Sequence, residues 1–244
     1  MYGNLKKKYG QNFLIDNNIL NKIVGIVPSN NLKILEIGPG DGRLTDKIIT
    51  KNPSKLTLVE IDKDLTNDLL LKYKFNNSIK ILTADILDLK IEDNYDLVIS
   101  NLPYNISSQI LVKLSLLQKP PYQLILMFQK EFAQRLLDKK INSINSLINC
   151  FYNIEFNFNV SKNCFRPVPK VDSSILTFTK KNNLLKKNEI NDFIIFKRNL
   201  FSHKRKSLKN LLKKYNINEK FNLNLRVENL ELATLIKIFR EINS

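Results

Sequence analysis

The pattern of apolar positions divides the chain into strand-length and helix-length segments. Short apolar runs, typical of buried strands, alternate with stretches in which apolar residues recur every three or four positions, as on one face of a helix. This alternation predicts a doubly wound α/β sheet of mainly parallel strands. The predicted strands are Lys33–Ile37, Leu56–Ile61, Ile79–Leu82, Tyr95–Ser100 and Tyr122–Phe128.

Segments on either side of these strands extend the sheet. Before the first strand, Asp16 can cap a helix that ends near Pro28. After the fifth, Ile154–Val160 and Ser174–Thr179 predict an antiparallel pair at the edge of the sheet, as is common in mixed sheets.

The strand pattern fades near Leu184, which predicts a small all-helical C-terminal domain. Its expected helices are Phe193–Phe201, Ser207–Lys214 and Glu231–Ile242. We therefore expect a catalytic domain over residues 1–180 and a helical domain over 184–244.

Basic residues are concentrated in this C-terminal part. The chain has a formal net charge of +16, and residues 184–244 contain 14 Lys or Arg against 6 Asp or Glu. Lys197–Lys214 holds eight basic residues and no acidic one. Such a surplus usually faces phosphate, so nucleic acid is the expected partner. The alternative is a solvated helix face in a lysine-rich protein.

The rarer residue types exclude several classes of chemistry. His203 is the only histidine, and Cys150 and Cys164 are the only cysteines. We therefore expect no metal site of Cys and His ligands and no nucleophile activated by histidine. The sequence has no apolar stretch long enough to span a bilayer, and Met1–Gln11 lacks the apolar core of a signal peptide. These features favour a cytoplasmic protein.

A cluster of glycines follows the first predicted strand. Three of the six glycines of the chain lie in Glu36-Ile-Gly-Pro-Gly-Asp-Gly42. Glycine there allows positive φ and lets a ligand approach the backbone. A dinucleotide fingerprint needs its third glycine where Arg43 stands. The pattern instead resembles the first motif of S-adenosylmethionine methyltransferases.

Two acidic residues end or follow the next strands. Glu60 ends the second strand, where a carboxylate can accept hydrogen bonds from both ribose hydroxyls. Asp85 follows the third strand, where an acceptor can hold an adenine amino group. A solvated carboxylate at Glu60 and a turn or cap residue at Asp85 are the alternative interpretations.

The motif Asn101-Leu-Pro-Tyr104 directly follows the fourth strand. It resembles the motif of enzymes that methylate exocyclic amino groups. The N6 lone pair of adenine is delocalised into the ring, so the amine needs acceptors for its hydrogens before it becomes a good nucleophile. The Asn101 side chain and a backbone carbonyl next to Pro103 can supply them, and Tyr104 can stack on a base that has left its helix.

Several motifs together resemble one family, the ribosomal RNA adenine dimethyltransferases that act on the small subunit. The resemblance covers residues 7–180 and extends into the C-terminal part. Besides the glycine turn and Asn101–Tyr104, it rests on Lys8-Tyr-Gly-Gln-Asn-Phe-Leu14, Leu126-Met-Phe-Gln-Lys-Glu131, Phe165-Arg-Pro-Val-Pro-Lys-Val-Asp-Ser173 and Lys204-Arg-Lys-Ser-Leu-Lys-Asn210.

The resemblance implies a Rossmann-like S-adenosylmethionine methyltransferase sheet and assigns a role to individual residues. The target amine would bind Asn101, and its base would lie between Tyr104 and Phe165. S-adenosylmethionine would contact Gln11, Asn12, Leu14, Gly38, Gly40, Glu60, Asp85 and Asn101. RNA would contact Lys204, Arg205, Lys206 and Lys209. For Phe165, a core aromatic is the alternative.

The same resemblance implies that two adjacent adenosines in the 3′-terminal hairpin loop of small-subunit ribosomal RNA are dimethylated. The expected partner is that RNA or its precursor particle. We expect a monomer without a metal ion. One departure concerns the substrate contacts: Asp138–Asn145 contains no glycine, whereas family members usually carry a glycine-containing loop there.

Four rival functions are open to the same sequence. They are a large-subunit adenine methylase, a non-catalytic assembly factor that binds ribosomal RNA, a DNA adenine methylase and a nicotinamide enzyme. Pro169–Ser173 and Lys204–Asn210 favour the small-subunit family over the large-subunit one. Intact Asn101 and Glu60 argue against a non-catalytic factor. No separate target-recognition domain is evident for DNA, and the glycine spacing disfavours nicotinamide.

Overall fold

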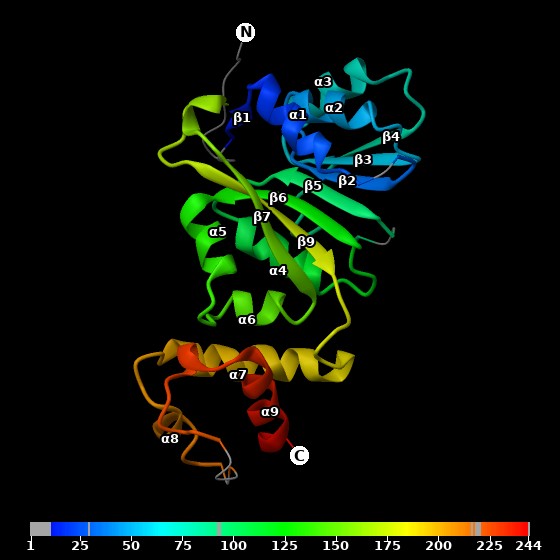
Figure 1. Cartoon of the computed structure of the whole chain (residues 1–244). Coiled ribbons are helices and arrows are strands. Elements are labelled where there is room, and N and C mark those ends of the chain that lie inside the picture. The colour runs from blue at the N-terminus through cyan, green and yellow to red at the C-terminus, as the bar shows by residue number, and fades with distance from the viewer. Residues whose placement is uncertain (1–10, 29, 92–93, 216, 218–220, 244) are drawn as a thin grey trace. The chain divides into compact units, whose positions relative to one another are not determined.

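A seven-stranded sheet forms the centre of the computed structural model (Figure 1). The structure describes residues 11–28, 30–91, 94–215, 217 and 221–243. The strand order is β4 (Ile79–Thr83), β3 (Lys55–Glu60), β2 (Lys33–Ile37), β5 (Leu97–Asn101), β6 (Gln123–Gln129), β9 (Ser173–Lys180) and β7 (Tyr152–Val160). The five predicted parallel strands are confirmed to within one or two residues at each end. Four of them are buried apolar runs, and the edge strand β4 is only partly buried.

The edge of the sheet changes direction. The strands from β4 to β6 are parallel, whereas β9 runs antiparallel to β6, with Gln129 opposite Ser173. Side-chain hydrogen bonds link Asn157 to Thr177 and Asn159 to Ser174 between β7 and β9, in the reversed order of an antiparallel pair. The predicted mixed edge is thus confirmed.

Helices cover both faces of this sheet. On one face lie α1 (Asn17–Gly25), α2 (Arg43–Ile49) and α3 (Lys63–Lys72), and on the other lies α4 (Ser107–Ser115) (Figure 1). The Asp16 carboxylate caps α1 as predicted, because it accepts hydrogen bonds from the amides of Asn18 and Ile19 at 2.9 and 3.0 Å. The core on this face joins Leu20, Ile23, Val24, Leu44, Ile48 and Leu69 to strand residues that include Ile34, Leu56, Leu58, Leu97 and Ile99.

A short two-stranded ribbon lies outside the main sheet. It pairs β1 (Phe13–Leu14) with β8 (Phe165–Arg166) in antiparallel fashion, with Leu14 opposite Phe165. The 3₁₀ turn η2 (Lys162–Cys164) precedes β8, and Ile15 donates its amide to the carbonyl of Cys164 at 2.9 Å. The ribbon therefore fixes the start of the described chain against a segment far away in the sequence.

The described chain forms two compact units. The first comprises residues 1–133 and 153–180, and the second comprises 134–152 and 181–244. The helix α5 (Lys130–Leu137) begins in the first and ends in the second. The second unit contains α6 (Asn145–Ile148), α7 (Ile190–Ser202), α8 (Leu208–Leu211), α9 (Leu232–Ile242) and the 3₁₀ turns η3 (Lys187–Glu189) and η4 (Val227–Asn229).

Two features of the second unit differ from the sequence-based expectation. Residues 134–152 group with the C-terminal helices, although we placed them with the sheet. The helix expected over Ser207–Lys214 is shorter: it ends at Leu211, because the chain enters a turn in which the amide of Tyr215 bonds the carbonyl of Leu212.

Candidate active site

The glycine turn after β2 lies where the order of strands reverses. The sheet continues from β2 to β3 on one side and to β5 on the other, so a crevice opens at the carboxyl ends of these strands. Gly38, Gly40 and Gly42 have φ of 66°, 59° and 79°. A side chain at Gly40 would lie 2.7 Å from the Phe13 ring, whereas the space beside Gly38 is open. Glycine is thus required at Gly40 by a close approach, and at Gly38 it leaves the backbone accessible.

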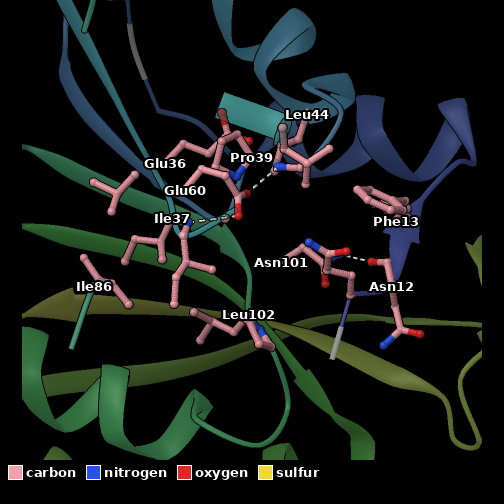
Figure 2. A pocket seen from close by; sticks show the side chains of 18 of the residues that line it. Asn12, Phe13, Glu36, Ile37, Pro39, Leu44, Glu60, Ile86, Asn101 and Leu102 are labelled. Carbon is pink, nitrogen blue, oxygen red and sulfur yellow. Dashed lines mark hydrogen bonds between the residues drawn. The ribbon is translucent and has the colours of Figure 1, made fainter. Parts of the chain in front are cut away.

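Glu60 faces this turn from the end of β3. One carboxylate oxygen accepts the amide of Gly40 at 3.1 Å, and the other accepts the amides of Ile61 and Asp62 at 3.0 Å each (Figure 2). Burial raises the pKa of this carboxyl, and the three amide hydrogen bonds oppose that rise. The carboxylate is therefore held in a fixed orientation at the pocket wall, with lone pairs that can accept further hydrogen bonds.

Asp85 and two isoleucines form the next part of the wall. The half-buried Asp85 accepts the amide of Leu87 at 2.8 Å through one oxygen, which orients the other. Ile61 and Ile86 follow Glu60 and Asp85 and also line the pocket. Apolar side chains next to carboxylates suit a flat base whose edge carries an amino group.

Asn101 is held by the N-terminal segment. Its side-chain amide nitrogen donates a hydrogen bond to the backbone carbonyl of Asn12 at 2.9 Å (Figure 2). That carbonyl is in place because Phe13 and Leu14 pair with β8. Because the nitrogen is engaged in this bond, the side-chain oxygen is the atom of Asn101 that can accept a hydrogen bond from a ligand.

Tyr104 follows Asn101 on the loop after β5. Its ring lines the pocket, and its hydroxyl lies 2.7 Å from the Ser173 hydroxyl on β9. Desolvation raises the pKa of Tyr104, so the phenol keeps its proton near neutral pH. The loop itself is braced, because Ser107 donates to the carbonyl of Tyr104 and the amide of Ile106 to that of Pro103.

Glu36 is a buried acid beneath the turn. Thr45 donates a hydrogen bond to its carboxyl at 2.7 Å. Burial raises the pKa of Glu36 to about 8, and the Thr45 hydrogen bond only partly opposes this. Glu36 is therefore largely protonated at neutral pH when the pocket holds no cation.

A single pocket brings most of the predicted site residues together (Figure 2). It holds about 1000 Å³ of empty space, part of it open to solvent. Its lining includes every predicted cofactor-binding residue, namely Gln11, Asn12, Leu14, Gly38, Gly40, Glu60, Asp85 and Asn101, together with Tyr104. Gln11 also donates to Asp62 at 3.3 Å. Positions 8–10 of the N-terminal motif lie outside the described residues.

The structure does not bring Phe165 into this pocket. Its side chain is fully buried in the core with Leu14 and Leu20, and it is absent from the described lining. The predicted contact with a target base thus has no support here, because a ring inside the core cannot face a ligand. The predicted RNA contacts Lys204, Arg205, Lys206 and Lys209 are exposed in the second unit.

Apolar lining residues were missed by the sequence reasoning. Phe13, Pro39, Leu44, Ile61, Ile86 and Leu102 all line the pocket. A signal was present for five of them, since Ile61 and Ile86 each directly follow a carboxylate that ends or succeeds a strand, and Phe13, Pro39 and Leu102 lie inside the motifs quoted above. Leu44 could not be found from a local pattern, because its approach depends on the packing of α2.

This donor set fits S-adenosylmethionine. An accessible glycine backbone, an oriented carboxylate at Glu60, a second at Asp85 and apolar walls match the parts of a nucleoside with a charged amino-acid tail. The sequence as a whole agrees with this interpretation of the pocket, because residues 3–244 match the family model described as ribosomal RNA adenine dimethylase. The chain belongs to the ribosomal RNA adenine dimethylase family. It is thus an S-adenosylmethionine-dependent methyltransferase.

Relatives of the dimethylase family match along nearly the whole chain. A ribosomal RNA small subunit methyltransferase A of Pelagibacter ubique is 41% identical over 99% of this chain and 98% of its own length. Its namesake in Mycoplasma capricolum is also 41% identical, over 97% of both chains.

Solved structures show the same fold. A dimethyladenosine transferase from Plasmodium falciparum has a TM-score of 0.81 at 24% identity, covering 95% of this chain and 97% of its own. The 23S rRNA methyltransferase ErmE has a TM-score of 0.76 at 22% identity, over 95% and 100%. The predicted Rossmann-like methyltransferase fold is confirmed by both.

The described residues contain neither a membrane-spanning helix nor a cluster of metal-binding side chains. None of their helices is both long and apolar enough to cross a membrane. Within the same part of the chain, His, Cys, Asp and Glu form no group of three that could hold a metal ion.

Proposed function

We propose that this protein transfers methyl groups from S-adenosylmethionine to the N6 amine of adenosines in small-subunit ribosomal RNA. The observation that carries the proposal is the hydrogen bond from the Asn101 amide nitrogen to the Asn12 carbonyl. It directs the side-chain oxygen of Asn101 toward the pocket as an acceptor for an amine. The small-subunit substrate is supported by the names of the relatives that match nearly end to end.

The residues of the pocket suggest how the reaction proceeds. The Asn101 oxygen accepts one N6 hydrogen, and the carbonyl of Leu102, fixed by Pro103, accepts the other. Both contacts draw the lone pair out of the ring and make the nitrogen a better nucleophile. Bound S-adenosylmethionine supplies an electrophilic methyl group on a sulfonium. Positioning accounts for much of the acceleration, and the surplus proton leaves to water after transfer, so no histidine is required.

Other residues hold the two partners in place. Glu60 accepts from the ribose hydroxyls, Asp85 from the adenine amino group, and the backbone at Gly38 lies against the cofactor. Gln11, Asn12, Leu14 and Gly40 complete that wall. Tyr104 stacks on the target base.

Finer features of the function are also part of the proposal. We expect dimethylation of two adjacent adenosines in the 3′-terminal hairpin loop, on a precursor particle in the cytoplasm. We further expect the protein to act as a monomer without a metal ion, which a gel-filtration profile and an assay in chelator can check.

The RNA contact is assigned to the exposed basic residues of the second unit. The surrounding stretch of sequence, Lys197–Lys214, contains no Asp or Glu to neutralise Lys204, Arg205, Lys206 and Lys209. Neutralising the first three should weaken RNA binding and lower the slope of log affinity against log salt by about 2 to 3, since each phosphate contact contributes roughly 0.7 to 0.9. An unchanged slope would remove this role.

The first experiment supplies purified protein, labelled S-adenosylmethionine and undermethylated small subunits, with large subunits in parallel. Mass spectrometry of the nucleosides should find dimethyladenosine in small-subunit RNA. Label confined to large subunits would instead establish a large-subunit enzyme. Tight subunit binding without label would favour an assembly factor.

A variant pair tests the residue that carries the proposal. Asn101→Ala should lower transfer roughly 100-fold or more, the loss typical for one essential polar contact in a transition state, while S-adenosylmethionine still binds. Asn105→Ala, at an exposed position on the same loop, is the matched control and should retain activity. Full activity of Asn101→Ala would overturn its role.

A further inference from the structure

The Tyr104 hydroxyl is anchored outside the loop that carries it. Its partner at 2.7 Å is the hydroxyl of Ser173, whose side chain is completely buried at the start of β9. Tyr104 belongs to the loop after β5, so this bond spans the neighbouring strand β6. The Tyr104 ring is thus tethered at both ends, by its own Cα and by a residue far away in the sequence.

Ser173 is itself a fixed point. Its backbone lies opposite Gln129 in the β6–β9 pair. The preceding residue, Asp172, accepts the amide of Lys130 through its carbonyl at 3.0 Å and the amide of Lys162 through its side chain at 2.9 Å. The backbone that carries this hydroxyl is therefore held in the sheet, between β6 and β7.

We propose that Ser173 is a positioning residue for methyl transfer: its hydroxyl fixes the position of the Tyr104 ring against the target base. The proposal rests on the proposed function, in which Tyr104 stacks on a flipped adenine. The Tyr104 hydroxyl oxygen lies on the axis about which the ring turns, so its hydrogen bond restrains the swing of the side chain about the Cα–Cβ bond and fixes where the ring lies. Without this bond, the ring can swing away from the base whose N6 amine Asn101 engages. The role falls in the C-terminal part of the Phe165–Ser173 motif, which contributes no residue to the predicted site.

The neighbouring Ser174 is a matched control. It is also almost fully buried on β9, and its hydroxyl donates one hydrogen bond of 2.7 Å, to the side-chain oxygen of Asn159 on β7. Alternation along a strand places it on the opposite face from Ser173. Ser174→Ala therefore removes the same atom and one hydrogen bond of the same length, away from Tyr104.

The test compares Ser173→Ala, Ser174→Ala, Tyr104→Phe and the double variant Ser173→Ala/Tyr104→Phe in steady-state transfer to small subunits. Ser173→Ala should lower kcat about 3- to 10-fold, the range expected for one lost hydrogen bond, with the KM for S-adenosylmethionine unchanged. Tyr104→Phe should give the same loss because the ring remains. The double variant should lose no more than either single one, since both remove one interaction.

A fluorescence readout reports the base directly. RNA with 2-aminopurine at the target position should be quenched on binding when the probe stacks on Tyr104. The quench should weaken in Ser173→Ala and Tyr104→Phe and persist in Ser174→Ala.

Defined outcomes overturn the positioning role. Equal kcat losses for Ser173→Ala and Ser174→Ala would reduce Ser173 to a structural residue, as would additive losses in the double variant. If Ser173→Ala does not fold, Tyr104→Phe removes the same hydrogen bond through its other partner. Unchanged kcat and unchanged fluorescence quenching in Tyr104→Phe would then overturn the positioning role. Absence of label with wild-type protein on either subunit would instead refute the proposed function, so the two failures are distinguishable.

Discussion

Two tight segments, one in each unit, satisfy their backbone polar groups in opposite ways. The turn at Gly38–Gly42 uses glycine to reach left-handed backbone conformations and leaves the space beside Gly38 open. The loop at Asp138–Asn145 contains no glycine, and side-chain amides fill the space beside its backbone. Each segment must satisfy its polar groups, but only the first must also admit a ligand.

The glycine-free loop is organised around two asparagines and a lysine. The buried Asn145 amide nitrogen donates to the carbonyls of Arg135, Asp138 and Lys140, at 3.4, 3.2 and 3.0 Å. Its oxygen accepts the amide of Asn142, whose own side chain accepts the amide of Asn145 in return.

Lys197 on α7 completes this arrangement. Its ammonium donates to the carbonyl and hydroxyl of Ser143, at 2.6 and 3.2 Å. The loop is closed by its own side chains, whereas the glycine turn leaves backbone accessible at Gly38. The departure from the family at this loop does not touch the cofactor pocket, whose lining lies in the other unit.

Gly40→Ala should give the largest effect. The new side chain would meet the Phe13 ring at 2.7 Å in addition to the left-handed backbone cost of about 1–2 kcal/mol. We expect calorimetry to show at least a tenfold loss of S-adenosylmethionine affinity. Gly25→Ala, at a glycine with open space and ordinary φ, is the control. Unchanged affinity in Gly40→Ala would mean that the turn tolerates a side chain and the contrast is false.

Asn145→Ala should be the next largest, and it should act on stability alone. The carbonyls of Asp138 and Lys140 lose this donor, whereas that of Arg135 keeps the side-chain amide of Asn142 at 2.7 Å, so we expect a cost of roughly 2–3 kcal/mol to the second unit. Hydrogen exchange of the Asn142 amide, which bonds the Asn145 side-chain oxygen, should accelerate, and S-adenosylmethionine affinity should stay unchanged. The half-buried Asn149 provides a control alanine variant. A loss of cofactor affinity would break the separation between the two segments.

A pair of opposite pH dependences is also expected. Burial raises the pKa of Glu36 from 4.5 to about 8, so its contribution to the stability of the first unit falls as the pH rises from 4.5 through 8. Burial lowers the pKa of Lys197 from 10.5 to about 8, so its contribution to the second unit falls as the pH drops from 10.5 through 8.

Hydrogen exchange in each unit as a function of pH measures both slopes. Glu36→Gln should remove the pH dependence of the first unit's stability between pH 4.5 and 8. Lys197→Met should remove that of the second unit between pH 8 and 10.5. A slope that persists in Glu36→Gln would assign the effect to another group, and Glu60, whose pKa is also raised, is the one to substitute next.

The local part of this site could be predicted from the sequence, because chemistry and spacing act over a few residues. The glycine turn follows a strand, and Glu60, Asp85 and Asn101 each end or follow one, so parallel pairing alone brings them to one edge. The non-local part could not. Ser173 meets Tyr104 only through the β6–β9 register, and Phe165 is drawn into the core by the ribbon with β1.

The division into units shows the same limit. The fading strand pattern near Leu184 correctly indicated helices beyond it, but no local pattern assigns 134–152 to them. That grouping depends on long-range contacts, such as the one between Lys197 and Ser143.

The β1–β8 ribbon has a consequence for the order in which the protein is made. Its two strands lie near opposite ends of the first unit's sequence, and the Asn12 carbonyl is placed by their pairing. While the chain is being synthesised, Phe13 and Leu14 cannot form this ribbon until Phe165 and Arg166 have emerged. A nascent chain that already carries the glycine turn and Asn101 therefore lacks the pairing that places the Asn12 carbonyl, and we expect the Asn101 amide to be held only late in translation.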